Sequence, residues 1–118
     1  MVSLHAPLTP RTRGLIGAAE VAMMKPGAVL VNTARGGLVD TGAVIEALRA
    51  GRIRAAALDV LDAEPPAAGR LPSDLRGLLV TPHMAYYSEE SLAESQRKAA
   101  TQIVKVLTGG QPDYPVRP

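Results

Sequence analysis

The chain has 118 residues and a formal net charge of +2, from 13 basic and 11 acidic residues that form no block of one sign. This length suits one small domain, and the balanced charge argues against a nucleic-acid surface or a membrane-binding patch. The absence of cysteine excludes disulfides and thiolate metal sites, and with neither a long apolar run nor the pattern of a secretory signal we expect a cytoplasmic protein.

The first predicted elements are two strands separated by a short helix. Residues 2–5 (VSLH) predict a short strand that nearby prolines end. Residues 17–24 (GAAEVAMM) predict a helix that stops at Pro26-Gly27. Residues 28–32 (AVLVN) form an apolar run without alternation, which is typical of a strand covered on both faces.

The next stretch predicts a helix and two more buried strands. Asp40 is a suitable N-cap for a helix that Gly51 ends. Residues 55–60 and 78–81 predict strands, and the Pro- and Gly-rich stretch 64–74 between them predicts a loop.

The last predicted element is a long helix. Either Ser88 or Ser91 can cap its start, and Ser91 with Glu94 fits a capping box. Apolar residues recur on one face of this helix, and Gly109-Gly110 ends it.

The alternation of apolar strands and helices predicts an open α/β fold with a parallel sheet. Such sheets bind ligands at the carboxyl ends of their strands. Polar side chains follow three of the predicted strands: Arg35, then Asp59 with Glu64 beyond it, then His83. Because parallel strands point the same way, we expect these side chains to converge on one edge of the sheet.

An arginine, a carboxylate and a histidine at one edge suit a particular chemistry. The guanidinium matches a carboxylate bidentately, and a histidine oriented by a carboxylate can transfer a proton near neutral pH. A substrate with a carboxylate and a carbonyl or hydroxyl would fit, with electrons supplied by a cofactor. Asp59 could equally make a structural hydrogen bond, and spacing alone does not choose between Asp62 and Glu64. The two histidines show no metal-ligand spacing, so no metal is expected.

Four blocks resemble, in order, the D-isomer-specific 2-hydroxyacid dehydrogenases. They are VSLHAPLTPRTRGLI (2–16), MKPGAVLVNTARGGLVD (24–40), AALDVLDAEP (56–65) and TPHMAYYSEESL (81–92). Glycerate, phosphoglycerate, lactate, glyoxylate and formate relatives share these blocks. The fourth block particularly resembles the branch that contains the C-terminal-binding-protein corepressors.

The resemblance implies a catalytic trio. Arg35 would hold the substrate carboxylate and polarise the carbonyl, His83 would be the general acid and base, and Glu64 would pair with His83. The implied reaction is hydride transfer between NAD(H) and a D-2-hydroxy or 2-keto acid, which is the small-molecule partner. A homodimer is the expected state of the full-length protein.

The resemblance also implies an NAD site along the same edge. Asp59 would contact the nicotinamide end of NAD, and the turn with Pro7 and Thr12 would lie near the adenosine half. The implied cofactor contacts are Pro7, Thr12, Thr33, Ala34, Arg35, Asp59, His83 and Ala85.

Two parts of the family pattern are missing from the sequence. It lacks the G-x-G-x-x-G turn and the acidic residue about 20 positions later that contacts the ribose. We therefore expect the second half of a Rossmann-like doubly wound sheet. Residues 1–108 would be a partial NAD-binding domain, residues 109–118 a tail returning to a substrate domain, and the chain alone inactive.

The sequence leaves several matters open. A non-enzymatic, NAD-sensing interaction protein of the corepressor type keeps the same trio, and an inactive truncated gene product is a third interpretation. The identity of the 2-hydroxy acid, the choice between NAD and NADP, and whether the chain folds or oligomerises alone are all undecided.

Overall fold

The computed structural model describes residues 1–116, so the last two residues of the predicted tail 109–118 lie outside the described residues. The chain divides into two compact units, Met1–Ala85 and Tyr86–Pro118. Each unit is described by itself below. None of the helices in the described part is both long and apolar enough to cross a membrane.

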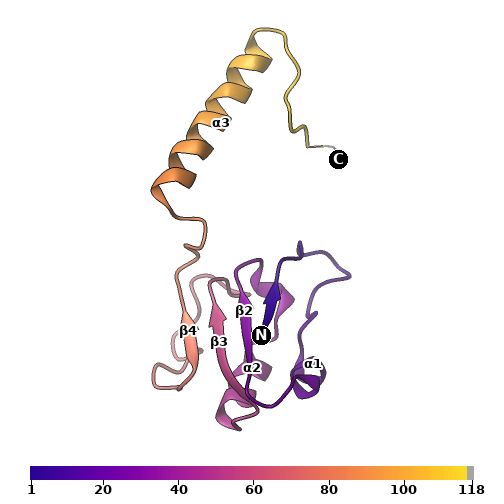
Figure 1. The fold of residues 1–118 in the computed structure, drawn as a ribbon, viewed down its shortest axis with the longest axis vertical. Coiled ribbons are helices and arrows are strands. Elements are labelled where there is room, and N and C mark those ends of the chain that lie inside the picture. The colour runs from indigo at the N-terminus through magenta and orange to yellow at the C-terminus, as the bar shows by residue number, and fades with distance from the viewer. Residues whose placement is uncertain (117–118) are drawn as a thin grey trace. The chain divides into compact units, whose positions relative to one another are not determined.

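The first unit is built on a four-stranded parallel sheet in the order β1-β2-β3-β4 (Figure 1). The strands are β1 (Val2–Leu4), β2 (Ala28–Asn32), β3 (Ile53–Leu58) and β4 (Leu78–Val80). Parallel neighbours that follow one another in sequence need crossover connections. The helices α1 (Ala18–Met23) and α2 (Thr41–Arg49) lie in two of these connections. The predicted α/β class with its parallel sheet is confirmed.

Strand β3 begins two residues before the predicted start at residue 55 and ends two residues before the predicted end. Ile53 is 2% exposed although basic residues flank it, so an inward apolar side chain at this position extends the strand backwards. At the other end, the chain leaves the ladder at Asp59, whose carboxylate accepts hydrogen bonds from the loop after β4.

The core of the first unit is aliphatic. Side chains from the sheet, both helices and the segment before α2 form one buried cluster, which consists of Leu4, Val21, Leu30, Leu38, Val39, Val44, Leu48, Ile53 and Ala56. The three tyrosines of the chain all lie in the second unit, with exposed fractions of 61% or more. The buried cluster of the first unit therefore contains no aromatic ring.

Helix α2 follows the expected signals. The Asp40 side chain accepts a hydrogen bond from the Ala43 amide at 3.1 Å and thereby caps the N-terminus. Val44, Ile45 and Leu48 on one stripe are buried. Gly51, just past the end, has a φ of 66°, a conformation that glycine adopts without strain.

The second unit contains the long helix α3 (Glu89–Leu107). Its N-cap is Ser88, whose hydroxyl accepts from the Ser91 amide at 3.1 Å while the Ser91 hydroxyl accepts from the Ser88 amide at 3.0 Å. The predicted capping box of Ser91 with Glu94 is therefore wrong. Ser91 is already inside the first turn, and Glu94 instead forms an ion pair with Lys98 at 2.8 Å.

Candidate active site

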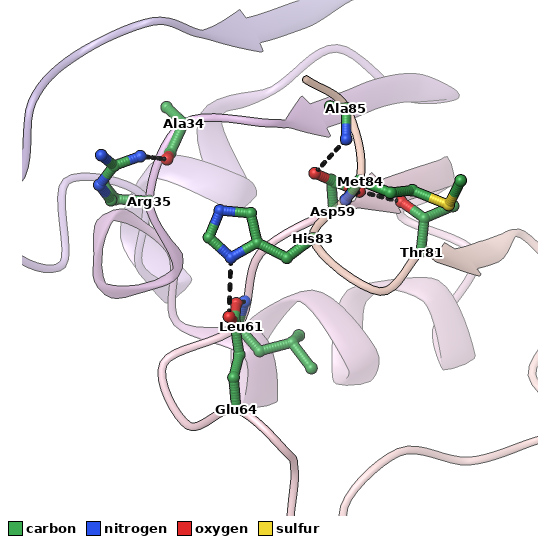
Figure 2. A network of polar contacts seen from close by, with 9 residues as sticks. All are labelled: Ala34, Arg35, Asp59, Leu61, Glu64, Thr81, His83, Met84 and Ala85. Carbon is green, nitrogen blue, oxygen red and sulfur yellow. Dashed lines mark hydrogen bonds and ion pairs between the residues drawn. The ribbon is translucent and has the colours of Figure 1, made fainter. Parts of the chain in front are cut away.

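Arg35, Glu64 and His83 line one cavity of about 340 Å³ in the first unit. Arg35 follows β2, Glu64 lies in the long loop after β3, and His83 follows β4. The carboxyl ends of three parallel strands thus deliver the three side chains to the same place, as the topology of such sheets requires. Figure 2 shows how these side chains and their partners lie.

The backbone that carries Arg35 is held by a buried amide. Asn32, the last residue of β2, has no exposed surface, donates to the Arg35 carbonyl at 3.0 Å and accepts from the Ala34 amide at 3.1 Å. Sequence analysis missed this residue. Its signal was a carboxamide at the end of an apolar strand, just where the chain must turn.

The turn after Arg35 requires glycine. A Cβ placed on Gly36 would lie 1.9 Å from the carbonyl carbon of Leu61, which is backbone and has no room to move aside. Gly36 therefore lets the chain after β2 touch the chain after β3. This close approach brings Arg35 next to the loop that holds Glu64.

Glu64 and His83 form the central contact of the site. The Nδ1 atom of His83 lies 2.8 Å from Oε2 of Glu64, with side-chain exposures of 51% and 38%. An ionised carboxylate only accepts hydrogen bonds, so we assign the ring hydrogen to Nδ1. This tautomer leaves Nε2 available to a ligand in the cavity.

The Glu64 carboxylate is itself anchored. Its other oxygen accepts a hydrogen bond from the Leu61 amide at 2.7 Å. The Leu61 amide and the His83 ring, by donating to Glu64, lower the pKa of its carboxyl. Glu64 is therefore negatively charged at neutral pH, as a partner that orients a histidine must be.

Asp59 organises the loop that presents His83. It is 5% exposed and accepts hydrogen bonds from the Thr81 hydroxyl at 2.5 Å and from the amides of Met84 and Ala85, each at 2.9 Å. Burial opposes ionisation of Asp59, but the hydroxyl and the two amides outweigh it and lower the pKa of the carboxyl. The structural role that the sequence left open for Asp59 is thus directly visible (Figure 2).

The backbone of His83 is in an unusual conformation. Its φ is 52°, in the left-handed region that residues other than glycine rarely adopt. The His83 amide donates to the carbonyl of Asp59 at 2.9 Å, which holds the residue there. Such strain persists only where the surroundings over-determine it, and it clusters at functional sites.

Four of the eight residues predicted to contact a cofactor line one cavity, and the other four do not. Pro7, Thr33, Ala34 and Arg35 line a second, open cavity of about 800 Å³ next to the first. Thr12 does not line that cavity, but its hydroxyl donates to the Pro7 carbonyl at 2.7 Å and so shapes the turn. Asp59 and Ala85, as described above, are bonded to each other through the Ala85 amide. His83 lines the first cavity.

The arrangement can bind and protonate a small organic acid. Arg35 donates to the neighbouring Ala34 carbonyl at 2.6 Å, and this bond uses one of the five N–H donors of the guanidinium. The remaining donors can hold a carboxylate, while His83, oriented by Glu64, can exchange a proton with an oxygen beside it.

Comparisons with known proteins identify a family. Residues 1–85 match the family model described as D-isomer specific 2-hydroxyacid dehydrogenase, NAD binding domain. The chain is 48% identical over 108 residues to the D-3-phosphoglycerate dehydrogenase of Methanocaldococcus jannaschii, covering 92% of this chain and 20% of that protein.

Two solved structures have the same fold. The TT0316 protein from Thermus thermophilus is 42% identical with a TM-score of 0.91, covering 98% of this chain and 37% of that one. A D-lactate dehydrogenase from Lactobacillus jensenii, crystallised with NAD⁺, is 34% identical with a TM-score of 0.87, covering 98% and 39%.

These relatives are much longer than the chain, which spans about a fifth of the curated relative and less than two fifths of either solved structure. The family match nevertheless includes the segments that carry Arg35, Glu64 and His83. With a matching family model over residues 1–85, the chain belongs to the D-isomer specific 2-hydroxyacid dehydrogenase family.

Proposed function

We propose that this chain supplies the acid–base and carboxylate-binding half of an NAD-dependent D-2-hydroxyacid dehydrogenase site. The reaction interconverts a D-2-hydroxy acid and the corresponding 2-keto acid. The observation that carries the proposal is the single cavity lined by Arg35, Glu64 and His83. Because the relatives are longer, the activity is proposed for this segment acting together with a substrate domain.

The residues beside the trio fit a nicotinamide cofactor. The second cavity is bordered by the small side chains of Ala6, Thr33 and Ala34, with Arg35 at its junction with the first cavity. Small side chains allow a flat ring to approach the backbone closely. When bound there, NAD(H) would supply or accept the hydride that none of these side chains can carry.

Each side chain has a distinct task in this proposal. Arg35 binds the substrate carboxylate through two parallel hydrogen bonds and so fixes the neighbouring carbon. His83 gives a proton from Nε2 to the carbonyl oxygen during reduction, and takes it back from the hydroxyl during oxidation. Glu64 holds the opposite ring nitrogen and stabilises the positive charge while the ring is doubly protonated.

The first test is a chimera in which this chain replaces the corresponding segment of the Methanocaldococcus jannaschii relative, assayed by NADH oxidation with a panel of 2-keto acids. We expect turnover that His83→Ala lowers by about 10²- to 10⁴-fold, because a positioned acid–base group contributes about that much. Arg35→Gln should raise KM and lower kcat together. Arg49→Gln, which removes an exposed arginine paired with Glu46 on α2, is the matched control and should leave turnover unchanged.

The same assay separates the alternatives. Turnover that survives His83→Ala contradicts the proposed mechanism. Binding of NAD by the chimera with no turnover of any 2-keto acid would favour a non-enzymatic, NAD-sensing interaction protein. We also propose that the 118-residue chain by itself shows no measurable turnover, because its sequence lacks the G-x-G-x-x-G phosphate-binding turn.

A further inference from the structure

A second arginine lies on the cavity of the catalytic trio. Arg13 lines this cavity with Arg35, Glu64 and His83 but belongs to the turn between β1 and α1. Its Nη1 atom lies 3.2 Å from the point where a Cβ on Gly37 would stand, so the guanidinium rests against the backbone just after Arg35. The side chain thus reaches the site from a different segment than any residue assigned above.

The backbone around Arg13 is fixed. The Arg13 amide donates to the Thr9 carbonyl at 3.0 Å, and the next amide, that of Gly14, donates to the Gly37 carbonyl at 2.8 Å. Two residues further on, Ile16 forms an isolated parallel bridge with Val39. The turn that carries Arg13 is therefore tied directly to the segment that carries Arg35.

Within residues 1–116, the Arg13 guanidinium has no ion pair and no hydrogen bond to another residue, whereas both acids on the cavity are paired. Glu64 is bonded to His83, and Asp62 forms an ion pair with Arg70 at 2.6 Å. The cavity consequently holds two guanidinium groups without a carboxylate partner. One 2-keto acid carboxylate can satisfy Arg35 but leaves Arg13 without an anion.

We infer that Arg13 selects substrates with a second anionic group, a distal carboxylate or a phosphate monoester, at the end opposite the 2-keto acid. This inference rests on the proposed function, which places the 2-keto acid on Arg35. Arg35 and Arg13 then hold the two charged ends of one molecule, and the arginine fork accommodates either anion bidentately.

The test compares ligands that differ only in the second anion. The 118-residue chain is titrated with 2-oxoglutarate and with 2-oxopentanoate, which has the same number of carbons but no distal carboxylate. A second pair is 3-phosphohydroxypyruvate against hydroxypyruvate. Binding is followed by amide chemical-shift changes in ¹H–¹⁵N NMR spectra at low ionic strength, where exposed charges are least screened.

We expect each ligand with a second anionic group to bind about ten-fold or more tightly than its partner, which is typical of one added charge-assisted hydrogen bond. Arg13→Gln should abolish this ratio and leave the weaker ligands unaffected. The matched control is Arg11→Gln, which removes the same charge two residues away, from an arginine that does not line the cavity. Unchanged amide dispersion in both variants shows that folding is intact.

The outcomes distinguish the two claims. The proposed function stands if 2-oxopentanoate binds and Arg35→Gln weakens that binding. In that case the inference about Arg13 is wrong if the ligands with a second anionic group bind no more tightly than their partners. It is equally wrong if their tighter binding persists in Arg13→Gln. If no 2-keto acid binds this chain and Arg35→Gln changes nothing, the inference about Arg13 is wrong, and the proposed function is decided separately by turnover in the chimera. A ratio found in only one ligand pair supports the inference and identifies the second anion as carboxylate or phosphate.

Discussion

At the scale of single residues, two buried polar side chains determine where the functional ones stand. Asn32 bonds the backbone on both sides of the turn that leads to Arg35. Asp59 accepts three hydrogen bonds from the segment around His83. Buried polar groups are costly unless they are bonded, and here their partners are the very loops that carry Arg35 and His83.

The hydrogen bonds to Asp59 predict how stability depends on pH. Because folding lowers the pKa of this carboxyl, its contribution is complete above the unfolded value, about 3.9, and is lost as the pH falls through the lower folded value. We expect the free energy of unfolding to decrease as the pH falls from about 5 toward about 2, an interval that contains the unfolded pKa. Urea denaturation followed by far-UV circular dichroism measures it. Asp59→Asn should be less stable near neutral pH and lose less on acidification.

The pKa of the Glu64 carboxyl in this unit is also lowered, so Glu64 changes stability with pH in the same direction. The comparison between wild type and Asp59→Asn therefore isolates the contribution of Asp59. Glu64→Gln serves as a reference, because it removes a carboxylate that is more exposed than that of Asp59. Parallel pH curves for the wild type and Asp59→Asn would contradict the assignment of Asp59 as the ionised anchor of the His83 loop.

At the scale of elements, local sequence signals locate helices and strands well but not their exact ends. Strand β2 matches its apolar run at both ends, and α2 begins after its predicted cap, Asp40. The start of β3 and the partner of the α3 cap were mispredicted, since each depends on which neighbouring side chain is inside or already bonded. Packing and capping geometry decide where these elements begin and end, and a residue pattern does not specify their ends to the exact residue.

Gly36 gives the sharpest prediction at this scale. Gly36→Ala forces a methyl group into the Leu61 backbone, so we expect the free energy of unfolding to fall by about 1–3 kcal/mol or more, as in overpacked cores. The control is Gly42→Ala on α2, where the nearest atom to an added Cβ is a side-chain oxygen of Asp40 at 3.2 Å. That change should stay within about 1 kcal/mol of wild type.

The stability of Gly36→Ala also tests the geometry of the cavity. If Gly36→Ala is as stable as Gly42→Ala in far-UV denaturation curves, the close approach of the chains after β2 and β3 is wrong. The cavity shared by Arg35 and Glu64 would then lose its physical basis, because that approach holds its two sides together.

At the scale of the whole molecule, strand order explains why Arg35 and His83 could be placed together from the sequence and Arg13 could not. Residues just past the ends of parallel strands must gather at one edge, so these two follow once the strands are found. Spacing did not choose between Glu64 and Asp62, and the structure pairs Glu64 with His83 and Asp62 with Arg70. Arg13 lies in a turn far from any predicted strand end. Its place on the cavity depends on backbone bonds to the segment at Gly37, which no local pattern encodes.

The open edges of the sheet predict self-association. In the part of the chain that the structure describes, β1 pairs only with β2, and its other side is unpaired. Unpaired strand edges are templates for another chain. We expect sedimentation velocity to show oligomers that increase with concentration, and Ser3→Lys on this edge to shift them toward monomer. Ala50→Lys, the same charge at the exposed end of α2, should have no effect, and a wild type that stays monomeric contradicts the prediction.

The aliphatic core determines which optical probes can follow the sheet. Tyr86, Tyr87 and Tyr114 are the only aromatic side chains besides histidine, and all three lie outside the first unit. Intrinsic fluorescence therefore originates in the segment that carries α3, and the sheet has no fluorescent side chain of its own. A tryptophan introduced next to the buried cluster would give the parallel sheet a signal of its own and show whether the two units unfold in one transition or two.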